Sequence, residues 1–584
     1  MTNGDIARTL ERIALILELK GGENPFRIRA YERAAVSVRN MDKDVRSVYE
    51  QGGTKALQQL PSIGKDLAEK IEEMLKTGKL AYLKKQEKGI PAGLITILDI
   101  EGMGPKRTKE LWDEFGIQSI DDLEKLAQSD ELRTRKGWGK KSAEAILRGI
   151  AQHRKMRGRL PLPQAEPLAR ELVRSLQDCG HVQRIEIAGS VRRGKETIGD
   201  IDILATSDKP EEVMAYFCTL PQVESVTARG RTKSTVFLRA GMDADLRIVE
   251  EGAFGAALLY FTGSKDHNIR IRRLGIVKKR TLSEYGLFAG TPKKKGEKIA
   301  AKTEEEVYKA IGLPYIEPEL REDTGEVQAA QRGKLPTLVQ ERDVIADMQM
   351  HSVFSDGKTS MADMARAAKT RGLRYIAITD HASPMGMVKG IRNTKKSVQT
   401  YLEAIKKARK QVPGIRILAG AEVDILKDGT LYLNDELLRQ FDWIVATVHQ
   451  YFHEPRKETT ARMIVAIRNP YVHMIGHPTA RMLSKRQGIA YDMDTVLETA
   501  RKHSVAMELN TSPDRLDLSA ENLRRAKEKG VRICISSDAH APQGLQYHYG
   551  ILQARRAWLE QKDFINMQPW HTFNAWRTKR QASS

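Results

Sequence analysis

The start of the chain carries apolar residues at helical spacing, interrupted by short turns rich in glycine. Ile6, Leu10, Ile13 and Leu17 recur every three or four residues, which predicts an amphipathic helix, because such positions share one face. Three later turns each precede a predicted helix. These helices are expected over residues 66–75, 106–115 and 142–153. We therefore expect about the first 155 residues to be helical.

After about residue 160 the pattern changes to the alternation of apolar and polar residues that is typical of strands. Residues 235–239 and 243–249 alternate in this way and are joined by a short connection that contains glycine, which predicts a hairpin. Asp200 and Asp202 stand two residues apart and would share one face of another strand. From Ile345 onward strands and helices alternate, which predicts an α/β domain.

The composition indicates a globular protein that binds a polyanion. With 584 residues, 40% of them hydrophobic, the chain has enough apolar material for several domains. Lys and Arg outnumber Asp and Glu by 97 to 76, and the net charge of +21 favours nucleic acid as the partner. No apolar run approaches the roughly 20 residues of a membrane span, and the start lacks the features of a signal peptide. Three distant cysteines predict neither a disulfide framework nor a cysteine-based zinc site. We expect a cytoplasmic, nucleoid-associated monomer that does not bind membranes.

A turn that suits a polyphosphate is followed by a pair of carboxylates. Residues 189–194 read Gly-Ser-Val-Arg-Arg-Gly and come directly after a predicted strand over 185–188. Asp200 and Asp202 would repel each other unless divalent cations neutralise them, and such oxygen-rich sites suit Mg²⁺ or Mn²⁺. Alone, an Asp-x-Asp pair or a basic loop is most often ordinary surface. Together, at this spacing, the two motifs favour two-metal phosphoryl transfer.

With these motifs the chain resembles the family X DNA polymerases of bacteria and archaea, which carry a PHP metallophosphoesterase domain behind the polymerase. The resemblance covers nearly the whole length. It implies a multidomain α and α/β fold: an all-α helix-hairpin-helix domain, a nucleotidyltransferase-type α+β polymerase core and a distorted α/β barrel. The expected segments are an N-terminal helical domain with the first hairpin motif (1–90), a fingers-like helical domain with further motifs (91–159), the palm and nucleotide-binding subdomain (160–316), a linker in which few residues could pack (317–343), and the PHP domain with a C-terminal tail (344–584).

The resemblance implies a third polymerase carboxylate that orients the primer 3′-hydroxyl. The family pattern Asp-Leu-Arg matches residues 245–247, so Asp245 would complete a catalytic, metal-binding triad with Asp200 and Asp202. Asp243 would share one face of its strand with Asp245, but it would face solvent or contact the catalytic residues without belonging to the triad.

The family's nucleotide-pocket signature matches residues 259–265, which read Leu-Tyr-Phe-Thr-Gly-Ser-Lys. By this resemblance Tyr260 and Phe261 pack on the sugar and exclude a 2′-hydroxyl, since a bulky ring fills that space. Elsewhere the same residues would mark only a helix end and a turn. Lys265 departs from the acidic residue of well-known relatives. The implied nucleotide-binding residues are Gly189, Ser190, Arg193, Tyr260, Phe261, Gly263, Ser264, Asn268 and Arg272, of which Asn268 and Arg272 face the minor groove.

The three glycine-rich turns near the start resemble helix-hairpin-helix motifs, which hold a DNA phosphate at a helix N-terminus without reading bases. The alternative for each is an ordinary helix-packing unit, and the first turn has Ser62 where the usual glycine stands. Lys70 falls where animal relatives carry the lysine of a lyase activity. At position 66, however, this chain has Asp where those relatives have a basic residue. A lysine on a helix is also usually an ordinary surface residue. The implied DNA-binding residues are Gly64, Lys65, Gly102, Gly104, Lys106, Gly137 and Gly139.

Polar residues recur just past the apolar strands of the last segment, as a barrel with its active site at the strand C-termini requires. Resemblance to the PHP domain implies the metal ligands Gln349, His351, Asp356, His381, Glu422, His449, His477, Asp538 and His540. Glu422 would bridge two of up to three Mn²⁺ or Zn²⁺ ions, which generate hydroxide and stabilise charge on a phosphate. Gln349 stands where the family has histidine, and a neutral amide is the weaker ligand.

The implied function is a DNA-directed DNA polymerase that fills short gaps in DNA repair, acts on gapped or primer–template DNA, and uses deoxynucleoside triphosphates with Mg²⁺ or Mn²⁺. The PHP domain would add 3′→5′ exonuclease activity, with 3′-phosphatase or abasic-site endonuclease activity as related reactions. One alternative is a nucleotidyltransferase for a small molecule or RNA joined to a metabolite phosphatase, against which the three turns and the charge argue. The other is a polymerase whose barrel is only a scaffold, against which the near-complete ligand set argues.

Overall fold

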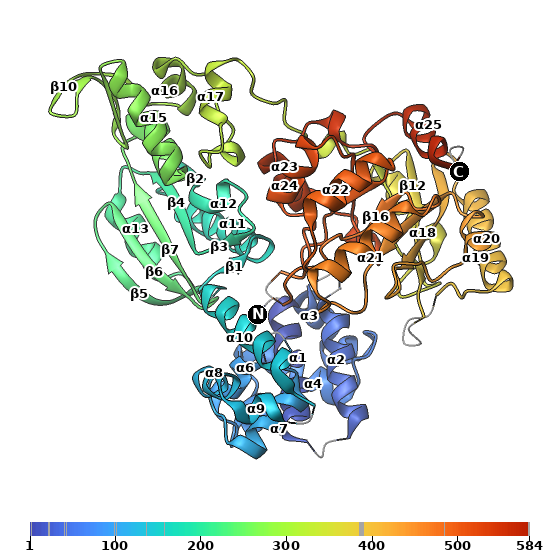
Figure 1. Cartoon of the computed structure of the whole chain (residues 1–584). Helices are drawn as coiled ribbons and strands as arrows, with labels where there is room; N and C mark the ends of the chain where they lie inside the picture. Colours follow the sequence, from blue (N-terminus) through green and yellow to red (C-terminus); the bar gives the residue numbers. More distant parts are fainter. Residues whose placement is uncertain are drawn as a thin grey trace. The chain divides into compact units, whose positions relative to one another are not determined.

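A computed structural model describes residues 1–584 except 2, 22, 23, 40, 42, 43, 99, 101, 136, 157, 385–389, 484 and 582–584. The chain divides into two compact units, Met1–Arg157 and Gly158–Ser584. Figure 1 shows helices and turns in the first unit, and both helices and sheets in the second. No helix among the described residues is both long enough and apolar enough to cross a bilayer.

The first unit is built from helices around two apolar cores. The helices are α1 (Asn3–Lys20), α2 (Pro25–Arg39), α3 (Val45–Gln58), α4 (Lys65–Thr77), α5 (Ala81–Glu87), α6 (Ala92–Ile97), α7 (Pro105–Phe115), α8 (Ile120–Gln128), α9 (Asp130–Thr134) and α10 (Gly139–Met156). One core lies around Leu10 and Ile71, and the other around Leu111. The three helices expected after the turns are confirmed as α4, α7 and α10. Glu101 and Lys136, which belong to two of these turns, lie outside the described residues.

The second unit begins with a five-stranded sheet in the order β2-β4-β7-β6-β5. Its strands are β2 (Arg184–Ile187), β4 (Asp200–Thr206), β5 (Val223–Arg229), β6 (Lys233–Leu238) and β7 (Met242–Ile248), beside the pair β1 (Leu160–Pro161) and β3 (Thr197–Ile198). The expected hairpin is confirmed as β6 and β7, and β4 runs parallel to β7. The helices α11 (Leu162–Asp178) and α13 (Pro210–Cys218) share a core with Ile201 and Ile203, so these residues define the covered face of β4. The aspartates of β4 therefore belong to the opposite face.

A smaller subdomain follows the palm sheet in the chain. It contains the 3₁₀ turn Glu251–Ala253, the helices α14 (Phe254–Thr262), α15 (Lys265–Val277) and α16 (Glu304–Ile311), and the sheet of β8 (Arg280–Ser283), β9 (Gly286–Thr291) and β10 (Lys294–Ala300). Residues from its helices and strands pack into one further core.

The segment 317–343 packs far more extensively than we expected, so the prediction that few of its residues could pack is wrong. It forms the 3₁₀ turns Pro318–Leu320 and Glu341–Asp343 and the helix α17 (Glu326–Gln331), and Leu320 and Leu338 belong to the same core as α14 and α16. Three of its charged residues, Glu319, Arg321 and Glu326, are buried and paired inside the protein. Arg321 is fully buried, and its Nη1 lies 2.6 Å from Glu304. Composition alone does not distinguish such paired charges from solvated ones.

The rest of the second unit is a nearly closed barrel of parallel strands, which confirms the expected α/β barrel (Figure 1). The strand order is β11-β12-β14-β15-β16-β17-β18, with β13 beside β14, and a bridge between Met350 and Ala539 brings the two edges together. The strands are β11 (Ala346–Asp347), β12 (Tyr375–Ile378), β13 (His381–Ala382), β14 (Arg416–Asp424), β15 (Trp443–Thr447), β16 (Met474–Ile475), β17 (Ala506–Asn510) and β18 (Ile533–Ser536). The helices are α18 (Met361–Thr370), α19 (Lys395–Gln411), α20 (Asp435–Leu438), α21 (Arg456–Arg468), α22 (Met493–Lys502), α23 (Ala520–Glu528), α24 (His548–Arg556) and α25 (Trp570–Gln581), with 3₁₀ turns at Pro542–Gly544 and Gln561–Asp563.

Helix α24 of the barrel contacts the turn after β2 in the palm. Gln553 is buried and donates from Nε2 to the Gly194 carbonyl at 3.1 Å. Arg556 donates from Nη1 to the Arg193 carbonyl at 2.9 Å. The turn expected to receive a polyphosphate is therefore supported by a helix more than 350 positions later in the sequence.

Two candidate metal centres

The three predicted polymerase carboxylates share one face of the palm sheet. In the parallel register of β4 and β7, Asp200 lies opposite Asp243 and Asp202 lies opposite Asp245. The alternate residues of both strands are buried, so the four carboxylates project from the other face. Asp200 and Asp243 are exposed, whereas Asp202 and Asp245 are half-buried. The sheet thus brings residues from two distant motifs to one place.

The charges on this face fit a divalent cation. Burial, and then the negative charges of Asp200 and Asp245, raise the pKa of Asp202 to about 7. Asp245 accepts a hydrogen bond from Thr235 Oγ1 at 2.5 Å and lies 2.8 Å from Lys233 Nζ. Oxygen ligands that repel one another in this way are the type that Mg²⁺ or Mn²⁺ binds.

The turn after β2 lies directly against one of these carboxylates. Gly189 begins the short helix α12 (Gly189–Arg192) with φ +61°, and a Cβ on it would lie 2.1 Å from Asp202 Oδ2. Only glycine fits there, because any side chain would collide with the carboxylate. Ser190 Oγ is buried and has no hydrogen-bond partner, whereas Arg193 Nε is paired with Glu322 at 3.0 Å. The Ser190 hydroxyl is therefore unpaired within the protein, and the Arg193 guanidinium is already held in place.

The predicted nucleotide-pocket residues lie at the junction of α14 and α15. The rings of Tyr260 and Phe261 meet edge to face, with their centroids 5.1 Å apart. Asn268 donates from Nδ2 to the Tyr260 carbonyl at 2.7 Å, and the Arg272 guanidinium lies 5.4 Å from the Tyr260 ring centre. The four residues therefore form one group around Tyr260.

The turn between α14 and α15 approaches the turn after β2. Gly263 ends α14 with φ +70°, and a Cβ on it would lie 3.2 Å from Arg193 Nη1. Ser264 caps α15, and its Oγ accepts a hydrogen bond from the His267 N–H at 3.2 Å. The two glycine turns expected around the nucleotide thus contact each other through Arg193.

In the first unit, two of the glycine-rich turns have the same backbone shape. Ser62 has φ +64° and Gly102 has φ +85°, so the serine adopts the left-handed conformation of the glycine that it replaces. Two residues later Gly64 and Gly104 precede α4 and α7 with φ of −82° and −85°, and no side chain caps either helix. The first N–H groups of both helices are therefore open to a phosphate.

The third turn differs from the first two. Gly137 is left-handed with φ +91°, but Gly139 also has a positive φ of +62° and itself begins α10. Lys65 and Lys106 are exposed beside the first two turns. These two turns match the expected phosphate-binding geometry better than the third.

Lys70 is not the ordinary surface lysine that its helical position suggested. It is only 9% exposed, its Nζ pairs with Asp66, and the same atom lies 4.8 Å from the centre of the Tyr82 ring. The Asp66 that departs from the relatives is therefore the partner of Lys70.

The second metal centre lies where the barrel strands end. Glu422 is in β14 opposite His381 of β13, and His449, His477 and Asp538 each stand two residues after a strand. Parallel strands end at the same side of a barrel, so these ligands are carried to one opening.

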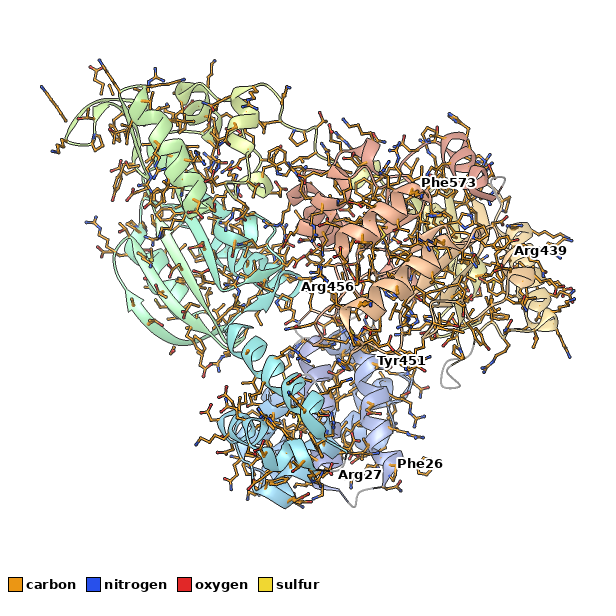
Figure 2. The ribbon with its side chains drawn as sticks, viewed as in Figure 1. Phe26, Arg27, Arg439, Tyr451, Arg456 and Phe573 are labelled. Carbon is orange, nitrogen blue, oxygen red and sulfur yellow. The ribbon has the colours of Figure 1, made fainter. Side chains whose placement is uncertain are left out.

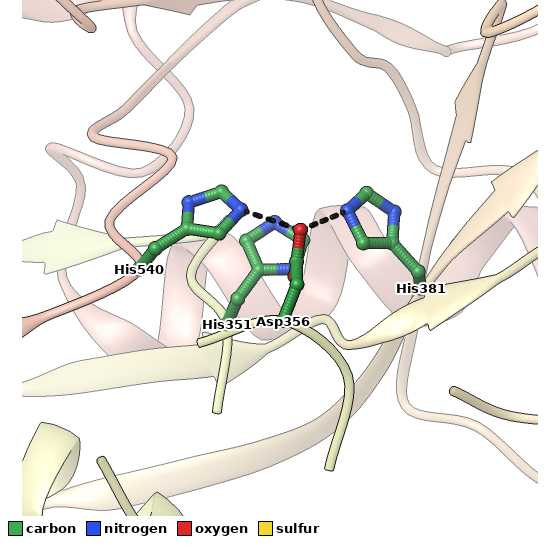
Figure 3. Close-up of side chains that lie close together, drawn as sticks. All are labelled: His351, Asp356, His381 and His540. Carbon is green, nitrogen blue, oxygen red and sulfur yellow. Dashed lines mark ion pairs between the residues drawn. The ribbon is translucent and has the colours of Figure 1, made fainter. Parts of the chain in front are cut away.

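Three imidazoles converge on Asp356, as Figure 3 shows. The distances to its carboxylate are 3.3 Å from His540 Nε2, 3.4 Å from His381 Nε2 and 3.8 Å from His351 Nδ1. Four polar side chains within one metal's reach are a plausible ligand set.

Glu422 is the centre of a second group. Imidazole nitrogens lie at 3.0 Å (His477), 3.2 Å (His381), 3.3 Å (His351) and 3.4 Å (His449) from its carboxylate. His381 and His351 also face Asp356 or Asp538, so Glu422 lies between neighbouring ligand groups. This arrangement suits a carboxylate that bridges two cations.

The pKa values in the barrel site depend on close contacts between imidazoles and carboxylates. Burial alone would raise the pKa of Glu422, but the surrounding imidazoles outweigh it and hold that pKa well below its usual range. Burial would lower the pKa of His449, but hydrogen bonds to Asp424 and Glu422 raise it to about 9. Burial and then Arg515 lower the pKa of His477 to about 4. Glu422 is therefore ionised at neutral pH, as a carboxylate ligand of a cation must be.

Several buried polar atoms of this site have no hydrogen-bond partner. They are both amide atoms of Gln349, Nδ1 of His351, Oε2 of Glu422 and Nδ1 of His477. Leaving such atoms unpaired is costly, and a cation would satisfy the acceptors among them. The donor set thus fits divalent metal ions.

Comparisons with known proteins identify the family. Family models match the helix-hairpin-helix domain (residues 1–80), a SAM-like helix-hairpin-helix tandem (94–152), the DNA polymerase beta thumb (257–322) and the PHP domain (347–512). The chain is 36% identical over 569 residues to the DNA polymerase/3′-5′ exonuclease PolX of Bacillus subtilis, and the match covers 97% of each chain. The chain belongs to the PolX family of DNA polymerases.

Two other relatives match separate parts of this PolX-family chain. DNA polymerase lambda of Rattus norvegicus is 27% identical over 347 residues, 55% of this chain and 56% of that protein. A "Probable phosphatase" of Thermoanaerobacter sp. is 30% identical over 208 residues, 34% of this chain and 79% of that protein. The predicted family X polymerase with a PHP domain is confirmed, and the family implies DNA, deoxynucleotides and divalent metal ions.

The polar residues that hold the ligands of the PolX-family barrel were not predicted from the sequence. Asp424 accepts a hydrogen bond from His449 Nδ1 at 2.7 Å, and Glu508 accepts one from the His477 N–H. Asp424 stands two residues after Glu422 on the same buried strand, a spacing that could have identified it.

Arg515 is a further residue that sequence reasoning missed. It lines a cavity of about 210 Å³ together with the ligands, its Nε lies 3.5 Å from Asp538, and its Nη1 is buried without a hydrogen-bond partner. It follows β17 in a loop with no recognisable motif, so the sequence carried no signal for it.

Proposed function

We propose that the chain fills short gaps during DNA repair by two-metal nucleotidyl transfer to a primer 3′ end. The observation that carries this proposal is the shared face on which Asp200, Asp202 and Asp245 meet, with Gly189 packed against Asp202. The three carboxylates would hold Mg²⁺ or Mn²⁺ there. When bound, these ions supply charge neutralisation at the primer hydroxyl and the α-phosphate.

Residues of the five-stranded sheet, of the turn after β2 and of the smaller subdomain would then position the reactants. Asp245, held by Thr235, would orient the end of the primer. The buried Ser190 hydroxyl would donate to the triphosphate. The Tyr260 ring would occupy the space that a ribonucleotide's 2′-hydroxyl needs, and Asn268 holds the backbone carbonyl of the same residue.

DNA itself would be held by its backbone. The open N-termini of α4 and α7, with Lys65 and Lys106 beside them, suit single phosphates and carry no base preference. Such contacts fit a polymerase that must act on any sequence.

We propose that the barrel is a phosphoesterase that removes nucleotides from a 3′ end, with 3′-phosphatase or abasic-site endonuclease activity as related reactions. The two ligand groups that meet at Glu422 and Asp356 support this, because they would hold two or three Mn²⁺ or Zn²⁺ ions. An inert scaffold is the second candidate. It is favoured by Gln349, whose neutral amide replaces an imidazole.

Primer extension on gapped DNA with Mn²⁺, with and without nucleotides, tests both activities. We expect the wild type to extend the primer with nucleotides and to shorten it without them. The double substitution Asp200→Ala with Asp202→Ala should abolish extension alone, and His351→Ala should abolish shortening alone. Asp243→Ala, which removes a carboxylate of the same face that is not part of the proposed triad, is the matched control and should extend normally. Extension by the double variant would contradict the polymerase site, and shortening by His351→Ala would contradict the barrel site.

A further inference from the structure

An exposed aromatic ring lies just beyond the ligands of the barrel. Tyr451 stands two residues after His449, in the loop that follows β15, and keeps 49% of its surface exposed (Figure 2). Lys427 follows β14, the neighbouring parallel strand, and is also exposed. Neither residue belongs to the ligand groups, yet the fold places both at the ligand end of the barrel.

The ring of Tyr451 is held by the structure beneath it. Arg462 of α21 is only 2% exposed and donates hydrogen bonds to backbone carbonyls of both loops. Its guanidinium lies 5.6 Å from the centre of the Tyr451 ring, and Lys427 Nζ lies 5.8 Å from the same point. The backbone of Tyr451 has φ +60°, a conformation that a bulky residue rarely adopts. Strained residues of this kind cluster at functional sites.

The surroundings of the ring combine aromatic and cationic groups. Phe452, the next residue, lies 3.9 Å beneath the guanidinium of Arg486 from the loop after β16. The cations already have some acidic neighbours, since Lys427 lies 3.9 Å from Glu454. Charge alone is therefore a weak attraction here, and a suitable ligand must offer a flat apolar face as well as phosphates.

We propose that the Tyr451 ring stacks against a base at or next to the 3′ end of single-stranded DNA while the phosphate of that end lies in the metal site. This inference rests on the proposed exonuclease function. Two residues span at most about 7 Å of extended chain, so Tyr451 and the ligand His449 are within reach of one nucleotide. Stacking is tolerant of sequence because every base has a π-face, which suits an enzyme that removes any nucleotide.

The test compares Tyr451→Ala with Tyr451→Phe in the full-length protein with Mn²⁺. The substrates are a single-stranded oligonucleotide and the same strand with abasic analogues in its last nucleotides. We expect Tyr451→Ala to lower kcat/KM about tenfold on the normal strand, mainly through KM, and to leave the abasic strand unchanged. Tyr451→Phe should retain activity on both. Tyr216→Ala, which removes a tyrosine that is 37% exposed on the palm, is the matched control and should behave as wild type.

An equal loss on both strands would overturn the proposal, because it would mean that Tyr451 only supports His449. No loss on either strand would overturn it as well. A binding experiment separates this inference from the proposed function. A strand with the fluorescent base 2-aminopurine at its 3′ end is added in EDTA, which prevents cleavage, and quenching of its fluorescence reports stacking. A wild type that cleaves neither strand would contradict the exonuclease, while quenching that depends on Tyr451 would still support stacking.

Discussion

At the scale of single residues, Gly189 shows how tightly the nucleotide turn and the metal carboxylates of the polymerase are packed. Gly189→Ala would place a methyl group 2.1 Å from Asp202 Oδ2, at a positive φ. We expect primer extension to fall at least about 100-fold, because a misplacement of about 1 Å at a reacting centre has that effect. Shortening of the primer by the barrel should remain.

Gly241→Ala provides the matched control for backbone strain. Gly241 also has a positive φ, +82°, but a Cβ there would meet nothing within 4 Å. It should cost about 1 kcal/mol of stability and leave extension nearly intact. If both variants extended equally well, the contact with Asp202 would be irrelevant to catalysis.

Gln349 is the residue at which this chain departs from the PHP ligand pattern. Its buried amide atoms have no hydrogen-bond partner within the protein, so the amide oxygen is available to a cation. We expect Gln349→His to raise the affinity of the barrel for Mn²⁺ or Zn²⁺ roughly tenfold, because imidazole is the stronger ligand. Calorimetric titration of the metal-free protein measures this, with Gln349→Ala as the comparison. An unchanged affinity in the histidine variant would show that this position does not bind metal.

At the scale of elements, the proposed DNA contacts of the first unit depend on the helix N-termini after the glycine-rich turns. Lys106→Ala removes an exposed charge beside the uncapped start of α7. Binding of duplex DNA should weaken similarly for all sequences, and the slope of log Kd against log salt should fall by about 1. Lys109→Ala on the same helix is the control, because Lys109 is paired with Asp113 at 2.9 Å. Equal effects from both lysines would argue against a specific phosphate contact.

The elements themselves were largely predictable, because their signals are local. The hairpin of β6 and β7 and the helices α4, α7 and α10 follow from alternation and glycine placement. The left-handed Ser62 was not predictable, since serine rarely adopts that conformation. The packing of 317–343 was missed because it depends on a residue distant in the sequence. Buried Arg321 is paired with Glu304, which belongs to another element.

At the scale of the whole molecule, α24 makes the barrel and the palm parts of one packed structure. His548 of α24 lies 3.0 Å from Glu166 of α11. The hydrogen bond to Glu166 raises the pKa of His548 above its usual 6.5. Burial would raise the pKa of Glu166, but His548 and Arg170 outweigh it and lower that pKa below its usual 4.5.

The sign of the resulting pH dependence follows from these two shifts. The raised pKa of His548 stabilises the fold below pH 6.5, and this contribution is lost as the pH rises through that raised pKa. The lowered pKa of Glu166 stabilises the fold above pH 4.5, and this contribution is lost on acidification. His548→Gln should therefore lower the free energy of unfolding most between about pH 5 and 6.5, by no more than about 1 kcal/mol because His548 is partly exposed, and Tm should fall with it.

Thermal unfolding of both proteins from about pH 5 to 9 checks this expectation. The difference should fade toward the alkaline end. His181→Gln is the control, since His181 pairs with Glu212 within the palm. A difference in Tm that did not change with pH would mean that His548 contributes through packing alone.

The sequence by itself determined the family, the order of the segments and nearly all the candidate ligands, because each depends on residues close together in the chain. Only the tertiary structure decided which of those residues meet. It placed Asp202 opposite Asp245, pressed Gly189 against Asp202, and gathered Glu422 with four imidazoles from separate strands and loops. It also revealed the contacts of Arg515 with Asp538 and of Tyr451 with Arg462, because contacts between separate loops and helices leave no local pattern in the sequence.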